Sequence, residues 1–170
     1  SILFRMQETA QQYVEILRDI LGIDVSTIDA DQVRVAGSGR MRARNGSNMA
    51  AYGNIVRHAL ETGQTVVVEH ALEDPLCADC PSRESCDNLS EIWSPILVDQ
   101  RAVGVIGCVC REPRQQESFL GKRELFTRFF DQFSGLLESK AHDLLAAERS
   151  EHVCRSLEQI LGRVQLGILI

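Results

Sequence analysis

The chain has 170 residues, of which 44% are hydrophobic and 25% are charged. This length matches a single domain with flanking helices and excludes two full domains, and the composition excludes wholesale disorder. The 18 basic and 24 acidic residues give a net charge of -6. We therefore expect no direct nucleic-acid binding, because an acidic chain repels the phosphate backbone.

The apolar runs exclude a membrane-spanning helix. A run such as 102–110 is far shorter than the roughly 20 residues that cross a bilayer. The chain does not open with a secretory leader pattern. We therefore expect a cytoplasmic protein, in which the six cysteines are reduced thiols or metal ligands rather than a disulfide framework.

The N-terminal half alternates helix and strand patterns. Apolar residues at intervals of four and three from Met6 to Ile20 predict an amphipathic helix over 4–21, which ends at Gly22. The next elements are two strands of a hairpin, a helix and a third strand, predicted at 23–28, 32–36, 49–61 and 65–69.

The loop 37–47 follows the first hairpin and carries a basic cluster. Its members are Arg40, Arg42 and Arg44. We interpret them as solvated side chains rather than as an anion site.

The C-terminal half contains a turn-rich loop, a second hairpin and a long helix. The loop covers 70–90, and the hairpin strands are predicted at 91–98 and 102–110. Pro95 indicates that the first of these strands is an edge strand or contains a bulge. After a loop over 111–120, the long helix begins at about Gly121.

The apolar stripe of this long helix has two parts. Four phenylalanines between 126 and 133 mark the side that meets the sheet, and a polar interval follows over 146–152. Val153, Leu157, Ile160 and Val164 then show coiled-coil spacing. We expect a globular domain over 1–147 and a coiled-coil linker over 148–170, whose last residues, 166–170, are typical of an opening strand in a further domain.

Together these elements predict an α+β fold. We expect a mainly antiparallel sheet of about five strands, flanked by helices and followed by a long C-terminal signalling helix. The matching apolar seams of the terminal helices predict a homodimer in which 6–20 and the C-terminal helix pack against their copies.

Cys77, Cys80 and Cys86 form the segment that most demands a chemical explanation. A two-residue gap lets two thiolates bind one metal ion or cluster, and the five-residue gap brings a third within range. All-thiolate sites suit zinc and iron–sulfur clusters alike. Redox-active thiols without a metal, or plain loop residues, are the alternatives.

The fourth ligand stays open. We take Cys110 as the candidate, and the others are Cys108, His70, Asp74, Asp79 and Asp87. Cys108 and Cys110 point to one face of the last predicted strand, where they are alternatively inert, buried thiols.

Catalysis has little support in this sequence. The four histidines are scattered, so that they form no Ser-His-Asp or Cys-His pattern. No glycine-rich phosphate loop is found either. We therefore expect that the chain is not an enzyme.

Five short segments resemble a known family. They are VRVAGSGR at 33–40, HALETGQTV at 58–66, EDPLCADCP at 73–81 with Cys86, SPI at 94–96 and VGVIG at 103–107. Over about 5–145 the chain resembles the GAF-type sensory domain at the N-terminus of some bacterial sigma-54-dependent transcriptional activators.

The resemblance implies a GAF fold, followed by a PAS domain, an ATPase domain and a helix-turn-helix. It matches the family's cysteine loop at Cys77, Cys80 and Cys86. Relatives often place a cysteine just before the Pro-Ile pair, whereas this chain has Trp93 and Ser94 there.

Three functional hypotheses follow. The first is a regulatory domain that senses redox state, a gas or a metal through an iron–sulfur cluster or metal in the cysteine loop, and signals through dimer helices. The second is a small-molecule receptor whose ligand lies between the sheet and the loops 37–48 and 70–90, with the cysteines as a structural zinc site. The third is a purely structural dimerisation domain.

Overall fold

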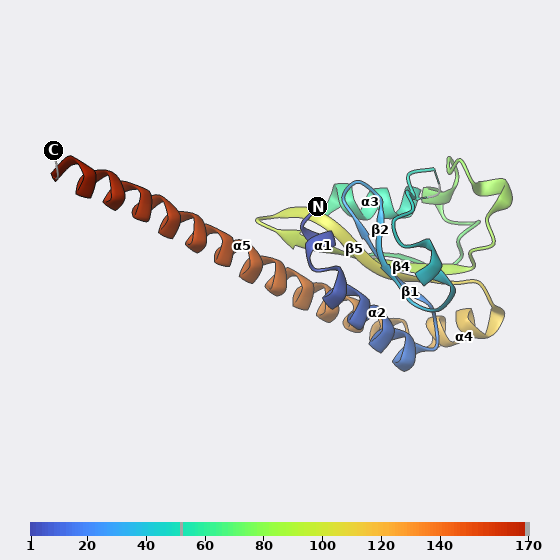
Figure 1. The fold of residues 1–170 in the computed structure, drawn as a ribbon. Coiled ribbons are helices and arrows are strands. Elements are labelled where there is room, and N and C mark those ends of the chain that lie inside the picture. The colour runs from blue at the N-terminus through green and yellow to red at the C-terminus, as the bar shows by residue number, and fades with distance from the viewer. Residues whose placement is uncertain (52, 169–170) are drawn as a thin grey trace.

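The computed structural model describes residues 1–51 and 53–168 and confirms the predicted α+β fold (Figure 1). One sheet contains five antiparallel strands in the order β2-β1-β5-β4-β3. The strands are β1 (Val25–Asp29), β2 (Arg34–Gly37), β3 (Val66–Val68), β4 (Ser90–Val98) and β5 (Arg101–Cys110). Both predicted hairpins are therefore present, as β1 with β2 and β4 with β5.

The helices divide between the two faces of this sheet. They are α1 (Ile2–Arg5), α2 (Gln7–Leu21), α3 (Asn54–Thr62), α4 (Pro113–Gly121) and α5 (Arg123–Ile168). Helices α2 and α5 pack against one face, which we call the helical face, and α3 packs against the opposite face, which we call the pocket face (Figure 1).

Strand alternation supplies each face with its own core. Ile92 and Ile106 pack with α2 and α5 on the helical face, where Phe126 and Phe130 are also buried. Residues such as Ile28, Val68, Trp93 and Val105 pack with α3 on the pocket face. Because neighbours along a strand point to opposite sides, one strand contributes to both cores.

Two helical predictions need correction. The predicted helix over 4–21 is interrupted at Met6, which separates α1 from α2, although it ends at Gly22 in the left-handed conformation as expected. The predicted loop over 111–120 contains α4. This helix begins with Pro113 after a capping box, in which Glu112 and Gln115 satisfy each other's backbone N–H groups.

Pro95 does not mark an edge strand. Strand β4 lies between β5 and β3, but β3 pairs only with the segment from Glu91 to Trp93. The short partner strand therefore ends before Pro95, and the register shifts just beyond, between Ile96 and Leu97. The alternative prediction, a bulge in the strand that contains Pro95, agrees with this register shift.

Helix α5 runs without a break through the polar interval 146–152. Glutamate, arginine and alanine are good helix formers, and Arg155 pairs with Glu151 one turn away. The predicted strand over 166–170 is wrong for 166–168, which are helical, and 169–170 lie outside the described residues. No helix in the described ranges is long and apolar enough to cross a membrane.

Candidate ligand pocket

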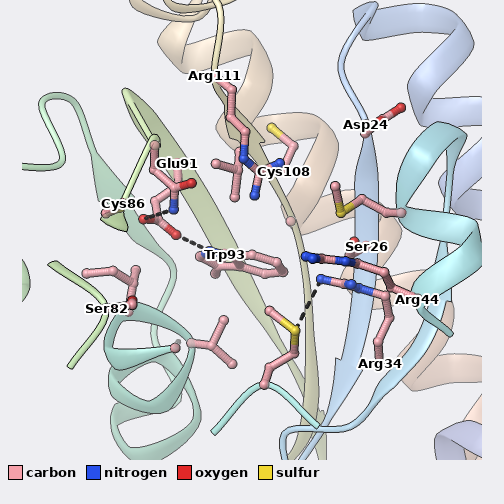
Figure 2. A pocket seen from close by; sticks show the side chains of 18 of the residues that line it. Asp24, Ser26, Arg34, Arg44, Ser82, Cys86, Glu91, Trp93, Cys108 and Arg111 are labelled. Atoms are coloured by element: carbon pink, nitrogen blue, oxygen red, sulfur yellow. Dashed lines mark hydrogen bonds between the residues drawn. The ribbon is translucent and has the colours of Figure 1, made fainter. Parts of the chain in front are cut away.

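A cavity of about 380 Å3 lies on the pocket face of the sheet (Figure 2). Its walls come from four strands, the start of α3, the 3-10 helix η1 (Gly39–Arg44) and the loop around the 3-10 helix η3 (Arg83–Ser85). This volume falls in the range of small-molecule sites, about 300 to 1,000 Å3. The cavity lies between the sheet and the two loops where the small-molecule hypothesis expects a ligand.

Arg34 is the most unusual residue of the pocket. It lies opposite Ile28 in the sheet and is only 3% exposed. Its Nη2 donates a hydrogen bond to the sulfur of Met49 at 3.4 Å, whereas Nε and Nη1 are buried with no partner in the part of the chain that the structure describes. A buried charge without a partner is costly, so this guanidinium favours an anion in the cavity.

The electrostatics of the pocket also favour an anion. Burial, and then the positive charges of Arg44 and Arg111, lower the pKa of Arg34 to about 10. The guanidinium is therefore still charged at neutral pH. Three positive charges that destabilise one another leave a site that a negative ligand would relieve.

Arg111 and Arg44 lie around the same cavity. Nε of Arg111 lies 3.1 Å from Oδ1 of Asp87. The side chain of Asp87 is largely exposed, so this ion pair is weak. Figure 2 shows Arg34 and Arg44 side by side at one side of the pocket, with Arg111 projecting toward its centre. Arg44 lines this pocket and adds positive charge to it, while its exposed side chain agrees with the interpretation of the basic cluster as solvated.

Its neighbours Arg40 and Arg42 do not line the pocket. Their side chains are exposed and lie within 3.9 and 3.6 Å of Asp24 and Glu15, respectively. The solvated interpretation therefore agrees with all three arginines of the cluster.

Trp93 forms the floor of the pocket. It is buried on β4 opposite Gly107 of β5. A Cβ atom at Gly107 would lie 2.6 Å from Cε3 of Trp93 and would also collide with the carbonyl oxygen of Ile92. The glycine therefore allows the indole ring to lie against the sheet, where it crosses the middle of the cavity (Figure 2).

Glu91 lies at the opposite side of the pocket from Arg34 and Arg44 (Figure 2). Its Oε2 accepts a hydrogen bond from Nε1 of Trp93 at 2.7 Å, and its Oε1 accepts a long one from Asn88 at 3.4 Å. Burial raises the pKa of the Glu91 carboxyl, and these two hydrogen bonds and the charge of Arg111 offset part of that effect. The pocket therefore has donors at one side and a buried acceptor at the other.

The reverse side of β4 is bonded to α5. Ser94, adjacent to Trp93, donates a hydrogen bond to Asp131 at 2.8 Å, and Thr65 donates to the same carboxylate oxygen at 2.7 Å. Glu138 accepts a hydrogen bond from the backbone N–H of Leu97 at 2.9 Å. The strand that carries the pocket floor is thus attached to the long helix by polar contacts.

The three loop cysteines lie close to the pocket. Cys77, Cys80 and Cys86 line one small cavity of about 20 Å3 together with Glu91. Burial raises the pKa of the Cys77 thiol to about 11, and the charge of Glu91 adds to this shift. Cys77 is therefore protonated at neutral pH. Within residues 1–51 and 53–168, no three His, Cys, Asp or Glu side chains are arranged to hold a metal ion.

Cys110 is not brought to the loop cysteines. It is buried in the core of the helical face, whereas Cys77 packs into the core of the pocket face. Cys108 packs with the same core as Cys110, although it also borders the pocket. The residues present do not form the four-thiolate site, because the sheet separates Cys110 from the loop. Cys154 is exposed on α5.

The sequence indicated the two loops that border the pocket, but it did not indicate the polar residues that line the pocket. Arg34 stands between Val33 and Val35 in a strand pattern, where an alternate position normally faces solvent. Trp93 was noted only as a departure from the family pattern. A charged residue between two valines, three positions before a Gly-Ser-Gly turn, is the one signal that could have drawn attention to Arg34.

Comparisons with known proteins agree with this fold. The GAF domain family matches residues 5–137. The chain is 31% identical, over all 170 of its residues, to an Escherichia coli (strain K12) protein with the provisional name uric acid sigma-54-dependent transcriptional regulator UacR. It spans only 28% of the length of that relative.

Two solved structures illustrate the shared fold. The free methionine-R-sulfoxide reductase from Neisseria meningitidis, in complex with its substrate, has a TM-score of 0.61 and 20% identity, with 83% of this chain and 80% of that chain covered. The A. aeolicus nlh2 GAF domain has a TM-score of 0.55 and 14% identity, with 81% and 85% covered. At these identities the likeness concerns the fold alone.

Proposed function

This chain belongs to the GAF domain family, and we propose that it is the sensory domain of a sigma-54-dependent transcriptional regulator whose signal is a small organic anion. The observation that carries the proposal is the buried guanidinium of Arg34, which lacks a protein partner for Nε and Nη1 among the described residues. The regulator relative supports this output and a binding rather than a catalytic role.

Urate is the first ligand to test. The name of the E. coli relative contains uric acid, and the identity extends over this entire chain. Urate is a planar monoanion at neutral pH, so it matches the pocket in charge, and a cavity of about 380 Å3 accommodates it. Its flat ring system also suits a tryptophan floor.

We expect the signal to leave the domain through α5. A ligand that moves Trp93 acts on β4, and the reverse side of β4 is bonded to Asp131 and Glu138 of α5. Differential binding to two arrangements of this helix is enough to switch a regulator, with typical coupling of about 1 to 3 kcal/mol.

Binding can be measured directly in this chain. Trp93 is the single tryptophan, so its fluorescence reports events in the pocket, and calorimetry gives the dissociation constant. We expect Arg34→Met to weaken urate binding by about 100-fold, equivalent to about 2.7 kcal/mol. Arg42→Met, which removes an exposed charge outside the pocket, is the matched control. Equal urate affinity of the Arg34→Met variant and the wild type would refute the proposal.

A second candidate function concerns the cysteine loop. The clustering of Cys77, Cys80 and Cys86 around one small cavity favours it, while the absence of a metal-holding arrangement among the described residues ranks it lower. Iron–sulfur or zinc binding stays a prediction. Elemental analysis and a visible absorption spectrum of anaerobically purified protein test it, and zinc without iron would favour a structural staple.

Dimerisation through the terminal helices is also a proposal. Val153, Leu157, Ile160 and Val164 are each more than half exposed, which supports packing of α5 against a second copy. Light scattering of the chain with and without 153–170 tests this, and an unchanged subunit number would contradict it. Like dimerisation, the cytoplasmic location that the sequence predicts stays a proposal.

A further inference from the structure

We infer that Glu91 is the specificity-determining residue of the pocket and selects a planar heterocyclic anion with N–H groups on the edge opposite its negative charge. This inference rests on the proposed function, because it concerns the ligand class of the same pocket. It goes beyond an anion site, since citrate and phosphate also satisfy an arginine cluster but offer no ring N–H group.

The hydrogen bonds of Glu91 leave acceptor capacity unused. A carboxylate can accept about four hydrogen bonds, and even a protonated carboxyl keeps an acceptor oxygen. In the part of the chain that the structure describes, Glu91 accepts one short bond from Trp93 and one of 3.4 Å from Asn88, which is beyond the usual range. The carboxyl group is buried and lines the cavity, so a ligand N–H group is the natural donor for the remaining sites.

The polar groups lie at two sides of the pocket. Arg34 and Arg44 stand at one side and Glu91 at the other, with Trp93 between them (Figure 2). A ligand that satisfies both sides carries negative charge on one edge and hydrogen-bond donors on the other. An anion with charged groups at both ends would place one of them beside the acceptor oxygens of Glu91.

Trp93 links this recognition to the shape of the ligand. Its indole N–H donates to Glu91, so the ring and the carboxyl group hold each other in place. Gly107 allows the ring to lie against the sheet, which leaves room for a flat ligand above it. A planar heterocycle can therefore stack on the floor while its edges reach Glu91 and the arginines.

The inference can be tested with urate and its three monomethylated analogues, 1-, 7- and 9-methylurate, by calorimetry on this chain. Each analogue lacks one N–H group of the urate anion. We expect at least one of them to bind the wild type about tenfold more weakly than urate. In Glu91→Met, urate affinity should fall about tenfold while the affinity for that analogue stays unchanged, so that the discrimination disappears.

Two further variants complete the design. Glu91→Gln retains one acceptor oxygen and should bind urate with intermediate affinity; it also replaces Glu91→Met if that variant does not fold. Glu84→Gln is the matched control, because Glu84 is exposed in the loop that precedes β4 and does not line the pocket.

The outcomes separate this inference from the proposed function. If all three analogues bind like urate, or if the Glu91 variants keep the wild-type discrimination, the inference is wrong. If citrate or phosphate binds as tightly as urate and this binding depends on Arg34, the anion site stands and only the inference fails. If urate binding does not depend on Arg34, the proposed function fails as well.

Discussion

On the helical face of the sheet, α2 and α5 cover a large apolar core, whereas the pocket face surrounds a cavity with three arginines and a buried carboxyl group. Both faces are built from alternate residues of the same strands. On the helical face, the burial of apolar side chains stabilises the fold. On the pocket face, buried charge costs stability, and the apolar cores of both faces offset this cost.

Neighbouring residues of β4 show this division most clearly. Trp93 lies on the pocket floor, and Ser94 points to the other side, where it bonds to Asp131 of α5. A single strand therefore connects a binding surface with an output helix. Substitutions on each face of the sheet test this difference.

The largest expected effect is on the helical face. Phe130→Ala removes a fully buried ring of α5 and should lower the free energy of unfolding by about 3 to 5 kcal/mol. Urea denaturation measures this change in the free energy of unfolding. Leu136→Ala is the control on the same helix, because Leu136 is 48% exposed and should change the free energy of unfolding by less than about 0.5 kcal/mol. Similar losses in both variants would contradict the assigned core.

A change of opposite sign is expected on the pocket face. Arg34→Met removes a buried, incompletely paired charge, so the free energy of unfolding without ligand should stay equal or rise by about 1 kcal/mol. Denaturation of the ligand-free variant beside Arg42→Met tests this. A loss of stability would show that Arg34 has a structural role and that the two faces do not differ in this way.

The smallest expected effect lies at the junction of β4 and α5. Asp131→Ala removes the acceptor for Ser94 and Thr65 and should cost about 1 kcal/mol of stability, while urate binding is retained. In the wild type, ligand should slow hydrogen exchange in the first part of α5. The variant should lose that response, whereas Asp143→Ala, an exposed substitution on the same helix, should keep it. Retention of the response in Asp131→Ala would exclude this contact as the connection.

Much of the fold could be predicted because it depends on local patterns. The Val- and Ile-rich runs predicted both hairpins, and the glycines at 22 and 63 end helices in the left-handed conformation that suits them. Helix α4 was missed although its capping box was visible at Glu112 and Gln115. The strand expected over 166–168 failed because a short apolar run fits a helix as well as a strand.

The candidate site was less predictable. Cysteine spacing drew attention to the loop, but spacing does not show that Cys110 faces the opposite core from Cys77. The local signal at Arg34 was weak, because a strand position that alternates with valines is equally compatible with solvent.

The sequence by itself determined the order of the five strands, the family pattern and the negative charge of the chain, because these follow from composition and from periodicity over a few residues. Only the tertiary structure decided that Arg34 is buried without a full set of partners, that Trp93 forms a floor and that Glu91 stands opposite Arg34 and Arg44. These properties depend on which distant segments cover a strand, and burial of a charge is decided by those segments rather than by its neighbours in sequence.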